Sequence, residues 1–80
     1  MKTITVTLED IAKGERGSAC SCPIALAIKR ATNQRCHVSP TLFCFERDLY
    51  DKPLPRVAGQ FVIAFDGNKP VEPFSFELDI

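Results

Sequence analysis

The sequence contains no apolar run that approaches the ~20 residues of a membrane-spanning helix. Its first residues alternate threonine with apolar side chains and lack the long apolar centre of a signal peptide. We therefore expect a cytoplasmic protein that neither spans a membrane nor is exported.

An excess of charge of one sign is also missing, because ten basic residues balance ten acidic ones. A net charge of zero provides no global field that would attract DNA, RNA or an acidic membrane. We therefore expect no nucleic-acid partner, and any anion site must be local. Little repulsion acts between copies, so a homodimer or a higher homo-oligomer meets no electrostatic obstacle.

Catalytic motifs are missing as well. The sequence has no Ser-His-Asp order, no HExxH, no Walker loop and no paired acidic motif, and His37 is its one histidine. We expect a protein that is not an enzyme, with no catalytic residue and no cofactor.

What is present suits one small globular domain. A chain of 80 residues can build a single modest core, and 45% hydrophobic residues with 25% charged residues match an ordinary folded protein. We therefore treat residues 1–80 as one domain.

Hydrophobic periodicity predicts strands, two main helices and one short helical turn. Residues 2–7 alternate as a strand does, and a turn capped by Thr7 and ended by Gly14 follows. Pro23 begins a helix that Asn33 ends. The remaining pattern predicts a hairpin of strands 36–39 and 42–47, a polar connection over 48–53, a helix from Leu54 to Phe65 and a strand over 74–78.

This order, β-α-β-β-α-β, predicts an α+β domain. It is compatible with a ferredoxin-like arrangement, in which two helices cover one face of an antiparallel sheet. Phe43 and Phe45 are expected on one face of their strand, with Leu42 and Cys44 on the other. Gly59 interrupts the second helix at a cost of about 1 kcal/mol relative to alanine.

The four cysteines are Cys20, Cys22, Cys36 and Cys44, with His37 as an additional candidate ligand. Structural zinc sites usually use C-x2-C to C-x4-C pairs, whereas this chain has a C-x-C pair and two cysteines on predicted strands. We expect no metal site and no disulfide, with some thiols buried as small apolar groups. Cys22 differs because it precedes Pro23 at a helix start, where backbone N–H groups favour a thiolate and a lowered pKa. The alternative, which we favour, is that Cys22 merely begins the helix, because a nucleophile also needs a base and an oxyanion site.

The loop of residues 14–22 combines glycines, serines and an arginine ahead of that helix. Such a loop can direct N–H groups, hydroxyls and a guanidinium at an anion, although it lacks the lysine and spacing of a P-loop. A plain connection is the alternative interpretation, and Lys29, Arg30 and Arg35 are read as solvated surface. The candidate ligand-binding residues are Arg16, Gly17, Ser18, Ser21 and Cys22.

Two segments, residues 22–28 (CPIALAI) and residues 65–78 (FDGNKPVEPFSFEL), resemble a family of small tailed-bacteriophage and prophage proteins without an assigned activity. The resemblance extends over most of the chain. It implies an accessory protein of the host cytoplasm that acts by binding a host protein or a host signalling molecule.

These observations favour a non-enzymatic binding protein that captures a small anionic ligand, such as a nucleotide or a nucleotide-derived host defence signal, at the loop 14–22. One alternative is a protein-binding inhibitor of a host defence protein, with strand phenylalanines as anchors. Another is a small metal or thiol-redox module, which predicts bound zinc or a rapidly alkylated Cys22.

Overall fold

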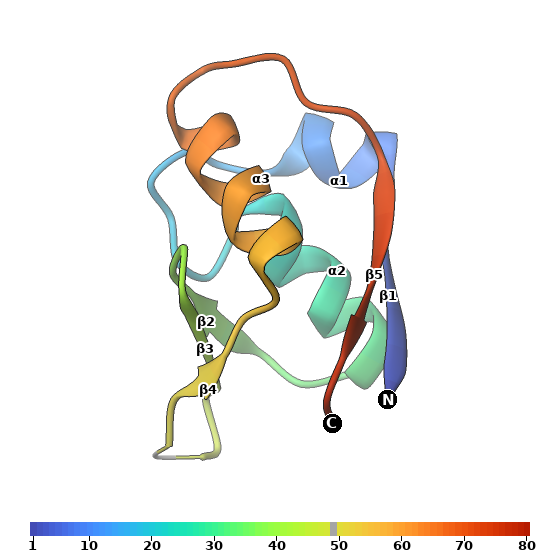
Figure 1. The fold of residues 1–80 in the computed structure, drawn as a ribbon, viewed down its shortest axis with the longest axis vertical. Coiled ribbons are helices and arrows are strands. Elements are labelled where there is room, and N and C mark those ends of the chain that lie inside the picture. Colours follow the sequence, from blue (N-terminus) through green and yellow to red (C-terminus); the bar gives the residue numbers. More distant parts are fainter. Residues whose placement is uncertain (49) are drawn as a thin grey trace.

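The protein is described by a computed structural model that covers residues 1–48 and 50–80. Figure 1 shows its elements in the order β1 Lys2–Val6, α1 Leu8–Lys13, α2 Pro23–Thr32, β2 Cys36–Val38, β3 Leu42–Phe45, β4 Lys52–Pro53, α3 Arg56–Asp66 and β5 Phe74–Leu78. This architecture confirms the expected α+β class. Within the described residues, no helix has the length and apolar character needed to cross a membrane.

The predicted helices and strands are all present, with differences at their ends. The polar connection predicted over 48–53 contains β4, and residue 49 of that prediction lies outside the described residues. Helix α3 begins at Arg56 instead of Leu54, because Pro55 is its N-cap and has a ψ of 143°, outside the helical range. A residue that precedes proline avoids helical geometry, so Leu54 stays outside the helix.

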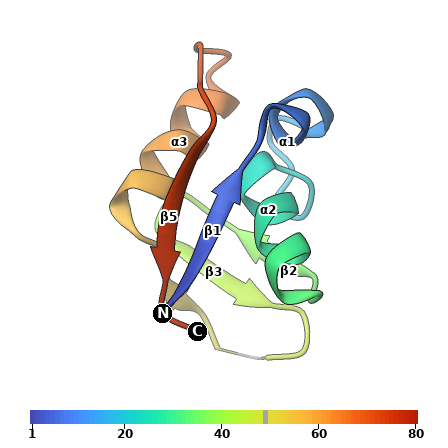
Figure 2. The same cartoon turned by 90° about the vertical axis from the view of Figure 1, so that its right-hand side faces the viewer.

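The strands form two antiparallel sheets. In one sheet β1 pairs with β5, from Lys2 opposite Leu78 to Val6 opposite Phe74, so residues 1 and 80 lie at the same end of this sheet (Figures 1 and 2). The other sheet has the order β2-β3-β4. Helix α2 contacts β1 of the first sheet and β2 of the second.

A single ferredoxin-like sheet is therefore not confirmed. Such a sheet would require β1 to pair with a strand of the central hairpin. Strand β3 has no free edge for this pairing, because β2 occupies one side and the unpredicted β4 occupies the other.

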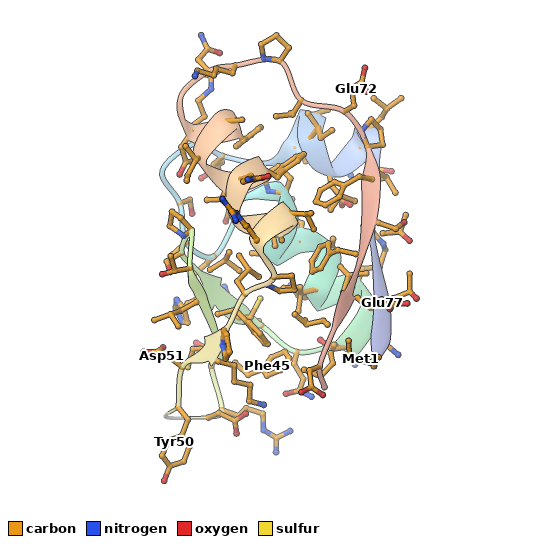
Figure 3. All side chains as sticks on the ribbon, in the orientation of Figure 1. Met1, Phe45, Tyr50, Asp51, Glu72 and Glu77 are labelled. Carbon is orange, nitrogen blue, oxygen red and sulfur yellow. The ribbon has the colours of Figure 1, made fainter. Side chains whose placement is uncertain are left out.

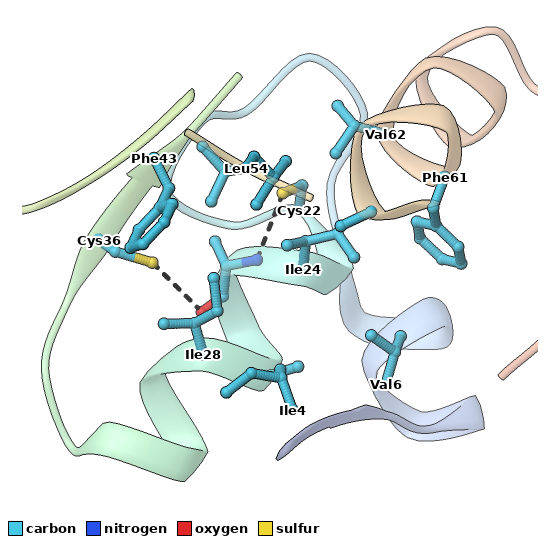
Figure 4. Packing of buried hydrophobic residues seen from close by; sticks show 14 of the residues in the cluster. Ile4, Val6, Cys22, Ile24, Ile28, Cys36, Phe43, Leu54, Phe61 and Val62 are labelled. Carbon is cyan, nitrogen blue, oxygen red and sulfur yellow. Dashed lines mark hydrogen bonds between the residues drawn. The ribbon is translucent and has the colours of Figure 1, made fainter. Parts of the chain in front are cut away.

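The core lies between the two sheets and around α2. Figure 4 shows aliphatic side chains from β1 and α2 packed against residues of β3 and α3. Ile4, Ile24, Ile28 and Leu78 are fully buried. The faces of β3 are as predicted, because its two phenylalanines are buried while its leucine is exposed.

A buried carboxylate joins α1, α2 and β1. Thr7 and Asp10 form the predicted cap of α1, in which the Asp10 N–H donates to Thr7 Oγ1 at 3.2 Å and the Thr7 N–H donates to Asp10 Oδ2 at 2.9 Å. Arg30 donates to both Asp10 oxygens at 2.6 and 2.8 Å, and to the Thr5 carbonyl at 2.6 Å. Arg30 is exposed, as expected, and its guanidinium also binds this buried carboxylate.

Gly59 has a specific packing role. The turn between β2 and β3 rests on α3 so closely that a Cβ at Gly59 would lie 2.0 Å from the Pro40 carbonyl oxygen. The next residue of the turn is Thr41, whose backbone carbonyl accepts a hydrogen bond from the Leu54 N–H at 2.9 Å. The cost of a glycine in the helix is thus offset by a contact between backbones that no other residue type permits.

Candidate functional site

The loop of residues 14–22 is held by its own hydrogen bonds. The Ser21 N–H donates to Ser18 Oγ at 3.2 Å, and the Cys22 N–H donates to the Ser18 carbonyl at 3.1 Å. The Gly17 N–H donates to the Asp66 carboxylate, at the end of α3, at 3.0 Å. The Gly17 N–H of the loop therefore binds a carboxylate of this same chain.

Cys22 is the N-cap of α2 and lies in the core (Figure 4). Its Sγ accepts the Ala25 N–H at 3.4 Å. Burial raises the pKa of the Cys22 thiol, outweighing the Ala25 N–H that favours the thiolate, and the negative charge of Asp66 acts in the same direction as burial. The expectation of a lowered pKa is wrong, because a desolvated sulfur gains more from keeping its proton than the helix start offers.

The candidate ligand residues share the loop, but they line neither of two hollows found in the described part of the chain. None of Arg16, Gly17, Ser18, Ser21 and Cys22 belongs to the lining of either hollow. Asp66 also brings negative charge to the loop, which disfavours a second anion there.

The larger hollow, of about 470 Å³, lies between α3 and the turn that joins β2 to β3. We call it the α3 groove, and its lining residues are Pro40, Thr41, Leu54, Arg56, Gly59, Gln60 and Ile63. Its volume falls within the range of roughly 300–1,000 Å³ that is usual for small-molecule sites. The Gly59–Pro40 contact fixes its two walls relative to each other.

The α3 groove combines apolar surface with a few polar groups. Leu54 and Ile63 contribute apolar side chains, whereas Arg56, Gln60 and Thr41 contribute a guanidinium, an amide and a hydroxyl. Within residues 1–48 and 50–80, Arg56 takes part in no ion pair. A free guanidinium can bind a carboxylate or a phosphate with two parallel hydrogen bonds.

The sequence prediction missed this groove. Arg56 and Gln60 lie one helical turn apart on the outer face of α3, where polar residues are ordinary and attract no notice. Two features of the sequence pointed to a contact surface on this helix. Gly59 is a glycine within a helix, and Ile63 is an apolar residue that does not belong to the buried face of the helix. Neither shows which turn lies opposite, because that depends on contacts between distant segments.

The smaller hollow, of about 260 Å³, lies at the outer edge of β2. Its lining residues are Ala19, His37, Val38, Ser39, Leu42, Phe43, Cys44 and Asp51. Beside it, Cys20 Sγ lies 3.0 Å from His37 Nδ1. The sequence prediction names His37 only as an additional candidate metal ligand, and the structure places its imidazole against Cys20.

The four cysteines are free thiols in different surroundings. Cys36 is buried, and burial raises the pKa of its thiol to about 12. Cys44 donates its S–H to the Asp48 carbonyl at 3.1 Å. The part of the chain that the structure describes contains no group of three or more His, Cys, Asp or Glu side chains arranged to hold a metal ion.

Comparison with known proteins yields no match to a family model, to a curated protein or to a solved structure. The resemblance to phage accessory proteins therefore stays a prediction, and arguments about function depend on the geometry of the chain itself.

Proposed function

We propose that this domain is a non-enzymatic binding protein that captures a small anionic ligand with an apolar portion in the α3 groove. The observation that carries the proposal is the Arg56 guanidinium, which forms no ion pair with any residue that the structure describes, beside the apolar surface of Leu54 and Ile63. The class of ligand is the one that the sequence predicts, whereas the site differs from the loop 14–22.

Charge and shape support this ligand class. The net charge of zero provides no general attraction for anions, so a local guanidinium beside apolar surface, as at Arg56, is needed to hold one. The Gln60 amide and the Thr41 hydroxyl add hydrogen-bonding groups that can orient a bound carboxylate or phosphate. None of the described residues that line the groove is aromatic, so a nucleotide would be held by its phosphate and sugar instead of by stacking on its base.

Calorimetric titration tests the proposal with a panel of inorganic phosphate, linear and cyclic nucleotides, and aliphatic carboxylates. We expect heat from at least one member, and Arg56→Ala should weaken that binding at least about tenfold, since a charged hydrogen bond contributes roughly 1.5–3 kcal/mol. Arg16→Ala is the matched control, because it removes the same charge from the loop 14–22. A loss of binding in Arg16→Ala alone would return the site to that loop, and a panel without heat would reject the ligand.

A second candidate is protein binding through the outer face of α3. Val57 and Ile63 are 55% and 59% exposed there, and Ile63 also lines the α3 groove. We propose that a partner with a carboxylate beside an apolar side chain would use the same groove. Ile63→Glu should then abolish partner binding, whereas sedimentation of the isolated chain shows whether a second copy is that partner.

A further inference from the structure

We propose that Cys20 and His37 form a reactive thiol–imidazole pair that exchanges with small disulfides. This inference is independent of the α3 groove, because it concerns a different hollow and different side chains. It begins from the 3.0 Å contact between Cys20 Sγ and His37 Nδ1, both of which belong to exposed residues.

Backbone hydrogen bonds place the two side chains. The Val38 N–H donates to the Ala19 carbonyl at 2.9 Å, which ties the loop 14–22 to the outer edge of β2. Since Cys20 follows Ala19 and His37 precedes Val38, this bond brings the sulfur and the imidazole together. The hydrogen bonds within the loop keep Cys20 in place before any reagent arrives.

The other three thiols are less available to a reagent. Cys22 and Cys36 are in the core. Figure 4 shows that the Cys22 sulfur accepts a hydrogen bond from the Ala25 N–H, and that the Cys36 thiol donates one to the Ala25 carbonyl. The Cys44 S–H is directed to the Asp48 carbonyl. Among the described residues, Cys20 is the cysteine whose sulfur lies within hydrogen-bond distance of a base, although Cys44 lies opposite His37 in the β2–β3 pairing. An adjacent base is what activates a thiol as a nucleophile.

The exchange reaction is balanced without any further reagent. As the Cys20 sulfur attacks one sulfur of a disulfide R–S–S–R, His37 takes the thiol proton, the R–S–S–R bond breaks and a new Cys20–S–S–R bond forms. The leaving thiolate then takes the proton from His37, so the products are the mixed disulfide and one R–SH. One half of the reagent is reduced and Cys20 is oxidised.

The hollow beside the pair can hold the R group that remains on Cys20. Its volume of about 260 Å³ suits a small substituent, and Val38, Leu42 and Phe43 give it an apolar wall. Asp51 and Cys44 are the other titratable residues in its lining, and Figure 3 shows Asp51 beside β4. A small disulfide with an uncharged R group therefore fits better than an anionic one.

The test treats the full reduced chain with dipyridyl disulfide, whose released thione is measured by absorbance. We expect one fast-reacting thiol per chain, which peptide mapping assigns to Cys20. Cys20→Ser should abolish the fast phase, whereas Cys44→Ser should keep it. A fast phase that maps to Cys44 or to a buried cysteine would overturn the proposal.

The role of His37 as a base is tested with His37→Gln, an exposed position whose folding is checked by circular dichroism. We expect this variant to react at least about tenfold more slowly near pH 7, because proton transfer to a positioned base typically contributes that much or more. Near pH 10, where an ordinary thiol ionises without help, the two rates should converge. If His37→Gln reacts at the wild-type rate near pH 7, or is slowed equally near pH 7 and pH 10, His37 is not the base.

Discussion

Gly59 determines how closely α3 and the turn between β2 and β3 approach each other. A side chain there would meet the Pro40 carbonyl oxygen, which is backbone and has no alternative rotamer. Helix propensity and packing therefore favour opposite residue types at this position. Alanine is the better residue for an isolated helix, and glycine is the better residue for this fold.

We predict that Gly59→Ala destabilises the protein. The gain in helix propensity is about 1 kcal/mol, but forcing a Cβ into a closed contact typically costs more, so we expect a net loss of about 2 kcal/mol in the free energy of unfolding. Urea denaturation measures this loss. Gln60→Ala is the matched control, since the next residue is exposed and should change stability by less than about 0.5 kcal/mol. A Gly59→Ala protein as stable as wild type would contradict the contact.

The cysteines show what the sequence can predict about single residues. Cys22 stands out in the sequence because it precedes a helix-starting proline, and the structure confirms that it is the N-cap of α2. Its burial and the pairing of Cys20 with His37 depend on where β2 lies relative to the loop 14–22. No local pattern contains this information, so the sequence prediction selected the less accessible of two neighbouring thiols.

At the scale of elements, local patterns were sufficient where they were long. The alternation in β1 and β5 and the helical spacing in α3 each extend over five or more residues and predict the correct element. Strand β4 has two residues, one of them proline, and no pattern of that length can be recognised. This short strand nevertheless closes the edge of β3 and so divides the strands into two sheets.

The Asp10–Arg30 pair connects elements, and we predict that it makes stability depend on pH. Burial alone would raise the pKa of Asp10, but the hydrogen bonds from Arg30 and from the Thr7 N–H outweigh it and hold this pKa below the ordinary value of 3.8. Stabilisation by Asp10 is then fully present above that value. It is lost as the pH falls further, through the lower pKa of the folded state.

We expect Asp10→Asn to lose about 1–3 kcal/mol of unfolding free energy near pH 7, the usual cost of breaking a charged hydrogen bond to a buried group. The difference from wild type should shrink near pH 2, which urea denaturation at the two pH values measures. Glu9→Gln serves as control, because the exposed Glu9–Lys13 pair should contribute little. A constant difference at both pH values would show that the charge of Asp10 is not responsible.

At the scale of the whole molecule, residues 1 and 80 lie at one end of the β1–β5 sheet. We predict that the chain folds when these ends are joined by a Gly-rich linker of about five residues and new ends are opened between Lys69 and Pro70. Both residues at the new opening are exposed and outside the helices and strands. Circular dichroism should show a cooperative thermal transition.

A permutant opened within α2, between Leu26 and Ala27, is the control. It should fail to fold, because α2 contributes buried residues that contact both sheets. If both permutants fold equally well, continuity of α2 is not required. If neither permutant folds, an intact connection between α3 and β5 is required for folding, even though its residues are exposed.

The pairing of β1 with β5 also sets how the molecule responds to force. Because the strands are antiparallel and Lys2 lies opposite Leu78, a pull that separates the two ends acts across the strands and not along them. The hydrogen bonds between the strands are then loaded one after another, as in a zipper. Tension on the ends should therefore open the β1–β5 sheet at low force, before it reaches the helices and the second sheet.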